Sequence, residues 1–337
     1  MLSTKLNEQF VKDYDLPINI FDEPYFTKRL KLFEPFYHSE TNYKQFMDDL
    51  RYSDYENYLY CQTRIQEQAS SDIKMTEAFQ RFRAVTQKET FTATNKSLKI
   101  ADLFTDQNHG KPFLSITLSD PHFSALWHYD PEIVEHACTW HSFISYYTDD
   151  QSIINSNRMP KGIFNACAQK QIIAYENDLM DQLIIQLIDG NMTIEDEIVF
   201  QSNDTLILDL SGLHTAHTQT FMEQAIREFV TTCRFTRWDS NNERTLPFKV
   251  ERFTLYKISN TNGVTSGFIK VKTNGDLEFC GFDPNVLPIV IRRLQSQVLE
   301  PEDKEFFYNG FKVKFHGAPK LLIPEPVFAA LTKRATT

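Results

Sequence analysis

Residues 112–118 read PFLSITL, and the stretch Trp127-His128-Tyr129-Asp130 follows this run closely. The run predicts a β-strand, and we expect the stretch after it to be extended as well. Side chains two apart in an extended segment point the same way, so His128 and Asp130 would direct an imidazole and a carboxylate to one point. With a second histidine, such a pair forms the facial triad that holds non-haem Fe(II) and leaves coordination positions open.

Composition alone does not make this pair significant. With 9 His and 45 Asp+Glu, about one His-x-Asp or His-x-Glu pair is expected by chance. A second one, His38-Ser39-Glu40, is present, and we interpret it as helix-cap chemistry. The metal hypothesis therefore depends on what the chain supplies downstream.

Several function classes are disfavoured by composition. Phe (28) is common and Gly (10) is scarce, and the chain has no G-x-G-x-x-G or Walker-type loop, so a nucleotide-cradling site is not expected. The five Cys are scattered without a C-x-x-C pair, which argues against a zinc site or disulfide framework and favours a cytosolic setting. No N-terminal apolar h-region and no apolar run of about 18 residues occurs, so we expect no membrane contact.

The net charge of −10 argues against nucleic-acid binding. This charge is unevenly distributed. From residue 241 onward the chain has 14 Lys+Arg against 10 Asp+Glu, or +4, which leaves 21 against 35, or −14, for residues 1–240. The shift coincides with a polar stretch at 239–244 and predicts a domain boundary there.

We predict a mainly β fold with flanking helices. Residues 1–95 read as helices that buttress a core at 96–240, where short β-prone runs separated by turn signals indicate a double-stranded β-helix, or jelly roll. Residues 241–337 read as a small α+β domain. The strands predicted in the core are 112–118, 140–148, 171–175, 182–188, 205–210 and 229–236. The later elements are strands at 253–258, 267–271 and 277–279, a helix at 286–299, and a hairpin at 306–311 around Asn309-Gly310.

The predicted strand 205–210 leads into the second part of the candidate site. It is followed by Leu213-His214 and then by a run containing Arg227, which we predict to be another strand. In a double-stranded barrel, His214 and Arg227 could both reach the interior. The guanidinium would hold a carboxylate through a bidentate, charge-assisted pair that Lys cannot match.

These motifs resemble those of the Fe(II)/2-oxoglutarate-dependent oxygenases, in the phytanoyl-CoA dioxygenase-like or taurine dioxygenase-like branch. The resemblance covers roughly 110–237. It implies that His128, Asp130 and His214 bind Fe(II), and that Arg227 binds the distal carboxylate of the co-substrate 2-oxoglutarate, with Thr148 or Ser145 as the assisting polar residue. It further implies a dioxygenase that uses molecular oxygen to hydroxylate, or otherwise oxidise, an unactivated C–H bond.

Several alternatives remain open. His217 competes with His214 as the distal ligand, and Arg234 competes with Arg227. The substrate we expect is a small polar, amino-acid-like metabolite, or one tethered to a carrier. A cupin-type dioxygenase without 2-oxoglutarate and an inactive barrel acting as a binding module are the other functions considered. We interpret His122, His136 and His141 as core or substrate-pocket residues, and the sequence leaves the oligomeric state open.

Overall fold

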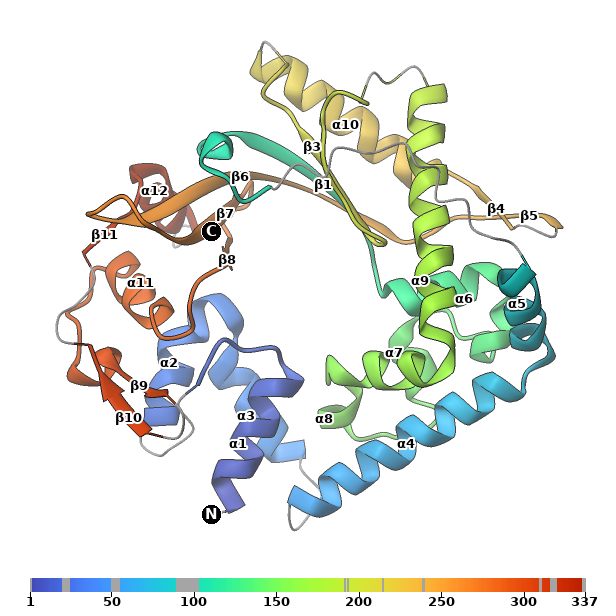
Figure 1. The fold of residues 1–337 in the computed structure, drawn as a ribbon, viewed down its shortest axis with the longest axis horizontal. Coiled ribbons are helices and arrows are strands. Elements are labelled where there is room, and N and C mark those ends of the chain that lie inside the picture. The colour runs from blue at the N-terminus through green and yellow to red at the C-terminus, as the bar shows by residue number, and fades with distance from the viewer. Residues whose placement is uncertain are drawn as a thin grey trace.

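The computed structural model of the chain describes residues 2–19, 25–49, 55–88, 103–190, 192, 194–213, 215–237, 240–308, 311–315 and 320–334. It is 55% helical and contains an open antiparallel sheet of seven strands, so the fold is mixed α/β. Figure 1 shows the sheet along one side of the molecule and most helices along the other. Among the helices of the described ranges, none is long and apolar enough to cross a membrane.

The strand predicted at 112–118 is confirmed, and it lies near the middle of the sheet. The strand order is β2-β3-β1-β6-β7-β8, and β11 also pairs with β6. In β1, Phe113 lies opposite Asp209 of β3 and Phe253 of β6. The strands of this sheet are β1 (Pro112–Leu118), β2 (Ile198–Gln201), β3 (Thr205–Asp209), β6 (Phe248–Asn260), β7 (Thr265–Lys272), β8 (Leu277–Cys280) and β11 (Leu321–Leu322).

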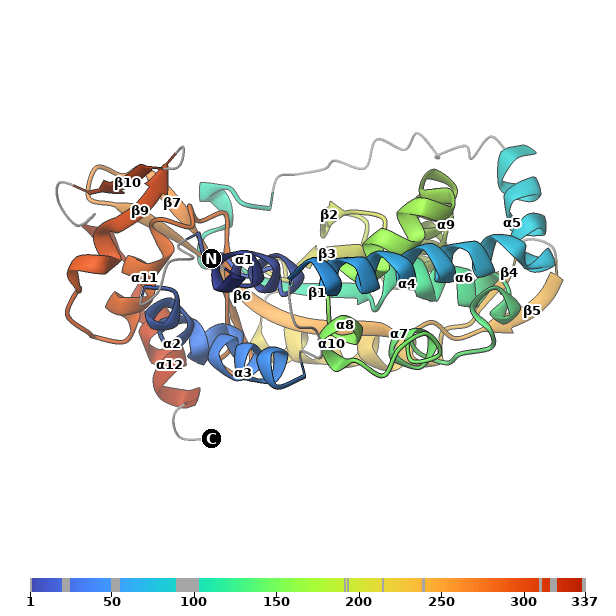
Figure 2. The ribbon, with the colours of Figure 1, turned by 90° about the horizontal axis from the view of Figure 1, so that it is seen from below.

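The helical N-terminal region is also confirmed. In Figure 2 the long helix α4 runs along the molecule between the short N-terminal helices and α5. Phe10, Phe46 and Tyr58 are fully buried where α1, α3 and α4 meet. The helices of this region are α1 (Leu2–Asp13), α2 (Tyr25–Tyr37), α3 (Ser39–Asp49), α4 (Tyr55–Met75) and α5 (Glu77–Lys88).

The predictions for the middle of the chain are partly wrong. The runs 171–175 and 182–188 lie in a helix rather than in strands of a barrel, as do the first part of 140–148 and the first half of 229–236; residues 235–236 belong to a short strand. Buried residues on the longest helix, such as Ile172, Tyr175 and Leu179, recur every three or four positions, which is the period of a helix. The helices after β1 are α6 (Pro121–Tyr129), α7 (Trp140–Ile144), α8 (Gln151–Ile154), α9 (Arg158–Asp189) and α10 (Ala216–Thr232).

The described strands therefore do not form a clear jelly roll, because most of them lie in one open sheet with helices packed against it. Short apolar runs fit a buried strand and a buried helix equally well, so the length of these runs does not distinguish a helix from a strand. The remaining strands outside the main sheet form two small hairpins. These are β4 (Phe235–Arg237) with β5 (Ser240–Arg244), and β9 (Glu305–Tyr308) with β10 (Phe311–Lys314).

The predicted boundary at 240 falls between strands that share one sheet. β6, which follows that boundary, pairs with β1, which precedes it. A buried ion cluster joins the two ends of the chain as well. The Arg29 guanidinium of α2 lies 2.7 Å from the Asp303 carboxylate, which also binds Arg292 at 2.9 Å.

The late strands and the hairpin at 306–311 are confirmed, although its Asn309-Gly310 turn lies outside the described residues. The late helices are α11 (Leu287–Leu294) and α12 (Glu325–Arg334).

Candidate functional site

The stretch Trp127–Asp130 ends a helix rather than continuing a strand. Pro121 occupies the first turn of α6, where its missing N–H costs nothing, and Asp130 is the residue that follows the last turn. Because successive helix residues are rotated by about 100°, side chains two apart diverge by about 200°. The expected convergence of His128 and Asp130 is therefore wrong.

His128 is a buried core residue. It is 0% exposed, its Nδ1 lies 2.7 Å from the Tyr175 hydroxyl, and its Nε2 lies 3.3 Å from the carbonyl oxygen of Phe235. A carbonyl can only accept, so Nε2 carries the proton and Nδ1 accepts from Tyr175. Burial lowers the pKa of His128 to about 4, which keeps the ring neutral. Neither nitrogen has a lone pair left for a metal.

The Asp130 carboxylate is committed to protein partners. One oxygen accepts a hydrogen bond from the backbone N–H of Glu132 at 3.2 Å. The other lies 3.3 Å from Arg81 and 3.4 Å from Arg237. These contacts start the 3-10 turn Pro131–Val134 and join α6 to α5 and β4.

Two arginines from the β4–β5 hairpin donate hydrogen bonds to carbonyl groups at the C-terminal end of α6. Arg237 donates to the carbonyl of Tyr129 at 2.9 Å, and Arg244 donates to the carbonyl of Trp127 at 2.8 Å. Each guanidinium also lies over the ring of the same residue, at 5.6 Å from its centroid. Basic groups at terminal carbonyls stabilise a helix C-terminus, so these aromatic residues of the motif have a structural role.

The other predicted site residues that the structure describes lie on different elements from α6. His214 lies outside the described residues. His217 is exposed in the first turn of α10. Thr148 lies in the loop after α7, where its hydroxyl accepts from the N–H of Asp150.

Arg227 lies on α10 instead of a strand. Its guanidinium donates to Glu223 at 2.8 Å and to the carbonyl of Val250 on β6, so it fastens the helix to the sheet. Arg234 is exposed and lies 3.5 Å from Glu243. Within the part of the chain that the structure describes, no group of three or more His, Cys, Asp or Glu could hold a metal ion. His128 and Asp130 are therefore not part of such a group among the described residues.

A different site lies at the other end of α6. A cavity of about 530 Å³ is bounded by the first turn of α6, the start of α9, Trp140 of α7 and the β2–β3 turn. We name it the dyad pocket, after the pair formed by His122 and Glu176. It is large enough for a small-molecule ligand. Carboxylates line it at Asp15, Asp120 and Asp204.

His122 lines this pocket and is held by a buried carboxylate. Its Nδ1 lies 2.5 Å from Oε1 of Glu176, whose side chain is 0% exposed. Asn203 donates to the other oxygen of Glu176. A carboxylate accepts, so Nδ1 of His122 carries the proton and Nε2 is the basic nitrogen when the ring is neutral. Nε2 has no hydrogen-bond partner among the described residues, and the side chain is 18% exposed.

A kink in α9 makes this arrangement possible. Ala168 has non-helical backbone angles, φ −149° and ψ 57°, which divide the helix into two parts. Phe164, before the kink, packs edge-on against the His122 ring, while Glu176, after the kink, reaches its Nδ1. A straight helix would separate these two residues by about 18 Å along its axis.

Asp120 supports a functional reading of the pocket. It has left-handed backbone angles, φ 43° and ψ 61°, and its carboxylate does not cap α6. Partial burial raises the pKa of Asp120. A residue other than glycine in this conformation is strained, and such strain concentrates at functional sites.

An oriented imidazole with one free nitrogen can remove a proton from a bound hydroxyl or water. From the sequence, His122 is expected to be a core or substrate-pocket residue, and no role is predicted for Glu176. A signal was present, since Glu176 lies among the buried apolar residues of α9. A charged residue on a buried helix face needs a partner, but the helical period had to be recognised first.

Comparisons of the chain with known protein families, curated proteins and solved structures find no match. The site must therefore be interpreted from its own residues.

Proposed function

We propose that the chain is an enzyme in which His122 acts as a general base, held in place by Glu176, on a small substrate that carries a cationic amine. The observation that carries this proposal is the 2.5 Å contact between Nδ1 of His122 and the buried Glu176 carboxylate, in a residue that lines a cavity and whose Nε2 has no hydrogen-bond partner among the described residues. Buried carboxylates need a partner of this kind. Here the partner is an imidazole, a group that can accept a proton and return it.

The reaction class that fits these groups is hydrolysis of an ester. Nε2 would take a proton from water as its oxygen attacks the carbonyl carbon. The ester C–O bond then breaks, and the imidazolium returns the proton to the departing oxygen. The Glu176 carboxylate stabilises the imidazolium between these steps and holds the ring in one orientation. General acid–base catalysis of this type contributes about 10²–10⁴-fold to rate.

The preference for a cation follows from the lining of the pocket. Three carboxylates, those of Asp15, Asp120 and Asp204, face one lysine, Lys161, which lies 3.4 Å from Asp15. The cavity also has an aromatic wall at Trp140, and aromatic faces attract organic cations. An amine attached to an apolar group would complement both features.

A pair of chromogenic esters tests the proposal. The p-nitrophenyl ester of an apolar amino acid carries an α-ammonium group, and its N-acetyl form does not. We expect the wild-type chain to hydrolyse the first ester at least about tenfold faster than the second. The reason is that the attraction between an ammonium group and a nearby carboxylate in a partly solvated pocket is on the order of 1–4 kcal/mol. His122→Gln should abolish most of this activity. His217→Gln, which changes an exposed histidine on α10, should not.

The proposal would be contradicted by equal hydrolysis in the wild type and His122→Gln, provided both variants fold. Equal rates for the two esters would overturn the preference for a cation but not the role of the base.

The Fe(II)- and 2-oxoglutarate-dependent hydroxylase remains a prediction from sequence alone, as do its cupin-type and binding-module alternatives and the jelly-roll core. Anaerobic titration with Fe(II), with and without 2-oxoglutarate, tests the first of these through the visible absorption of the chelate. For that function, His128→Ala and Asp130→Ala would have to abolish iron binding and Arg227→Ala would have to weaken 2-oxoglutarate alone.

A further inference from the structure

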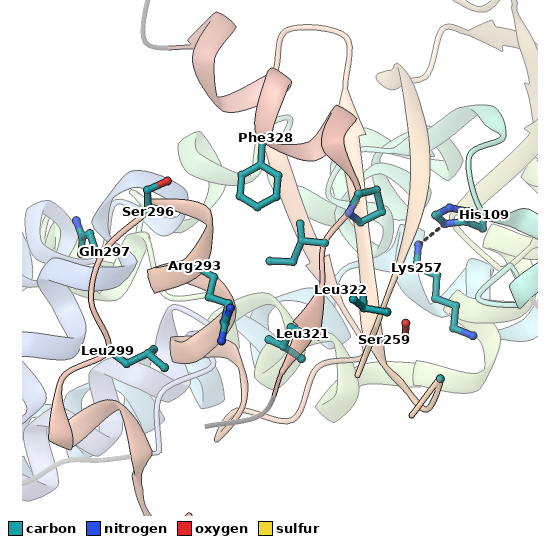
Figure 3. Close-up of a pocket in the computed structure, with 13 residues that line it drawn as sticks. His109, Lys257, Ser259, Arg293, Ser296, Gln297, Leu299, Leu321, Leu322 and Phe328 are labelled. Carbon is teal, nitrogen blue, oxygen red and sulfur yellow. Dashed lines mark hydrogen bonds between the residues drawn. The ribbon is translucent and has the colours of Figure 1, made fainter. Parts of the chain in front are cut away.

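A larger cavity lies at the opposite end of the sheet from the dyad pocket. It has a volume of about 830 Å³ and is bounded by β6, the end of α11 with the loop after it, β11 and the start of α12 (Figure 3). We name it the cationic pocket. Its volume lies within the range of small-molecule sites, about 300–1,000 Å³.

The two formally charged groups of this pocket, Lys257 and Arg293, are both cationic. His109, Lys257 and Arg293 line it, and none of the described lining residues is acidic. Lys257 is partly neutralised, because its Nζ lies 2.7 Å from the exposed carboxylate of Asp106. Nδ1 of His109 accepts the backbone N–H of Lys257 at 3.0 Å, so its Nε2 is the nitrogen that can donate to a ligand.

Arg293 is the cation available to a ligand. Its neighbour Arg292 is held by Asp303 at 2.9 Å and by Glu300 at 3.3 Å. Arg293 is exposed, and no described residue forms an ion pair or side-chain hydrogen bond with it. Figure 3 shows its side chain extending from α11 toward Leu321. A guanidinium placed in this way can bind a carboxylate with two parallel hydrogen bonds.

Beside Ser259, Gly263, Ser296 and Gln297, the rest of the wall is apolar. It is formed by Leu299, Leu321, Leu322, Ile323, Pro324 and Phe328. Leu322 is 55% exposed, so part of this surface is in contact with water and would gain by being covered. A ligand that satisfies both parts of the pocket must have an anionic end and an apolar body.

We propose that the cationic pocket binds a small amphipathic carboxylate, whose carboxylate pairs with Arg293 and whose hydrocarbon chain lies against Leu322 and Phe328. The inference goes beyond the hydrolytic function proposed above, because the two pockets have no residue in common and favour ligands of opposite charge. Each can fail without the other.

Isothermal titration of the full chain tests this proposal, with decanoate below its micelle concentration as the probe. We expect decanoate to bind, butyrate to bind at least about tenfold more weakly because it buries fewer methylenes, and decyltrimethylammonium not to bind. Arg293→Gln should weaken decanoate binding by about tenfold or more. Arg64→Gln, which changes an exposed arginine on α4, should leave the affinity unchanged.

Leu322→Ser provides an independent variant, because a half-exposed residue can be replaced without loss of the fold. It should weaken decanoate about threefold and leave butyrate unaffected. The proposal would be overturned by decanoate binding equally to the wild type and Arg293→Gln, or by decyltrimethylammonium binding as tightly as decanoate.

Discussion

The two ends of α6 carry two histidines in opposite situations. At the N-terminal end, His122 lines a cavity, donates Nδ1–H to a buried carboxylate and has no partner for Nε2 among the described residues. At the C-terminal end, His128 donates Nε2–H to a backbone carbonyl, accepts from a tyrosine and has no contact with solvent. The more conspicuous sequence motif surrounds His128, whose two ring nitrogens are both engaged in hydrogen bonds.

This difference shows what makes a histidine available for chemistry. Availability depends on a free nitrogen that reaches a cavity and on a partner that fixes the other nitrogen. Both conditions are set by residues distant in sequence, Glu176 and Asn203 for His122, and Tyr175 and Phe235 for His128. The following predictions test the contrast, beginning with the largest expected effect.

Replacing Glu176 by Gln should have the largest effect. The amide keeps the shape of the side chain but loses the charge that stabilises the imidazolium, so kcat for the cationic ester should fall by about 10²-fold or more with little change in KM. Glu176→Asp should recover part of the activity. An equal loss of kcat in Tyr175→Phe, which changes the partner of His128, would mean that the two histidines are not functionally distinct.

The second prediction concerns pH and His128. Its pKa is about 4 in the folded chain, below the ordinary value of 6.5, so the unfolded chain takes up a proton first as pH falls. Stability should therefore decline from about pH 6.5 to about pH 4, by on the order of 3 kcal/mol from this group. Urea denaturation at several pH values should show a flatter profile for His128→Gln. Parallel profiles for His128→Gln and the wild type would contradict the assignment.

A smaller effect is expected from Tyr175→Phe. This change leaves Nδ1 of the buried His128 without its donor, which should lower the free energy of unfolding by about 1–3 kcal/mol. Tyr146 is 64% exposed, so Tyr146→Phe should change stability by less than about 0.5 kcal/mol. Denaturation of both variants under the same conditions provides the comparison, and equal losses would argue against the buried hydrogen bond.

The smallest effect concerns Asp120, the strained residue in the lining of the dyad pocket. Asp120→Gly should be more stable than Asp120→Ala by about 1 kcal/mol, because glycine adopts left-handed angles without penalty. Both variants should bind the cationic ester more weakly, as both remove a carboxylate. If alanine and glycine were equally stable by chemical denaturation, the left-handed conformation of this residue would be in doubt.

Part of this molecule could be predicted from sequence. The runs 112–118 and 205–210, and the strands from 253 to 279, carry β-prone residues bounded by turn signals, and all are strands of the sheet. The runs 171–175 and 182–188 were too short to show the period of the helix to which they belong. The pairing of His122 with Glu176 depends on the kink at Ala168. No local sequence pattern predicts that kink.

The central claim is that His122, and not His128, is the chemically available histidine of α6. A ¹⁵N NMR spectrum of the histidine rings, recorded at a pH where both are neutral and repeated after anaerobic addition of Fe(II) and 2-oxoglutarate, tests it most directly. The account predicts a proton on Nδ1 of His122 and on Nε2 of His128, with the His128 signals unmoved by iron. Selective loss of the His128 signals on iron addition, or a proton on Nε2 of His122, would contradict it.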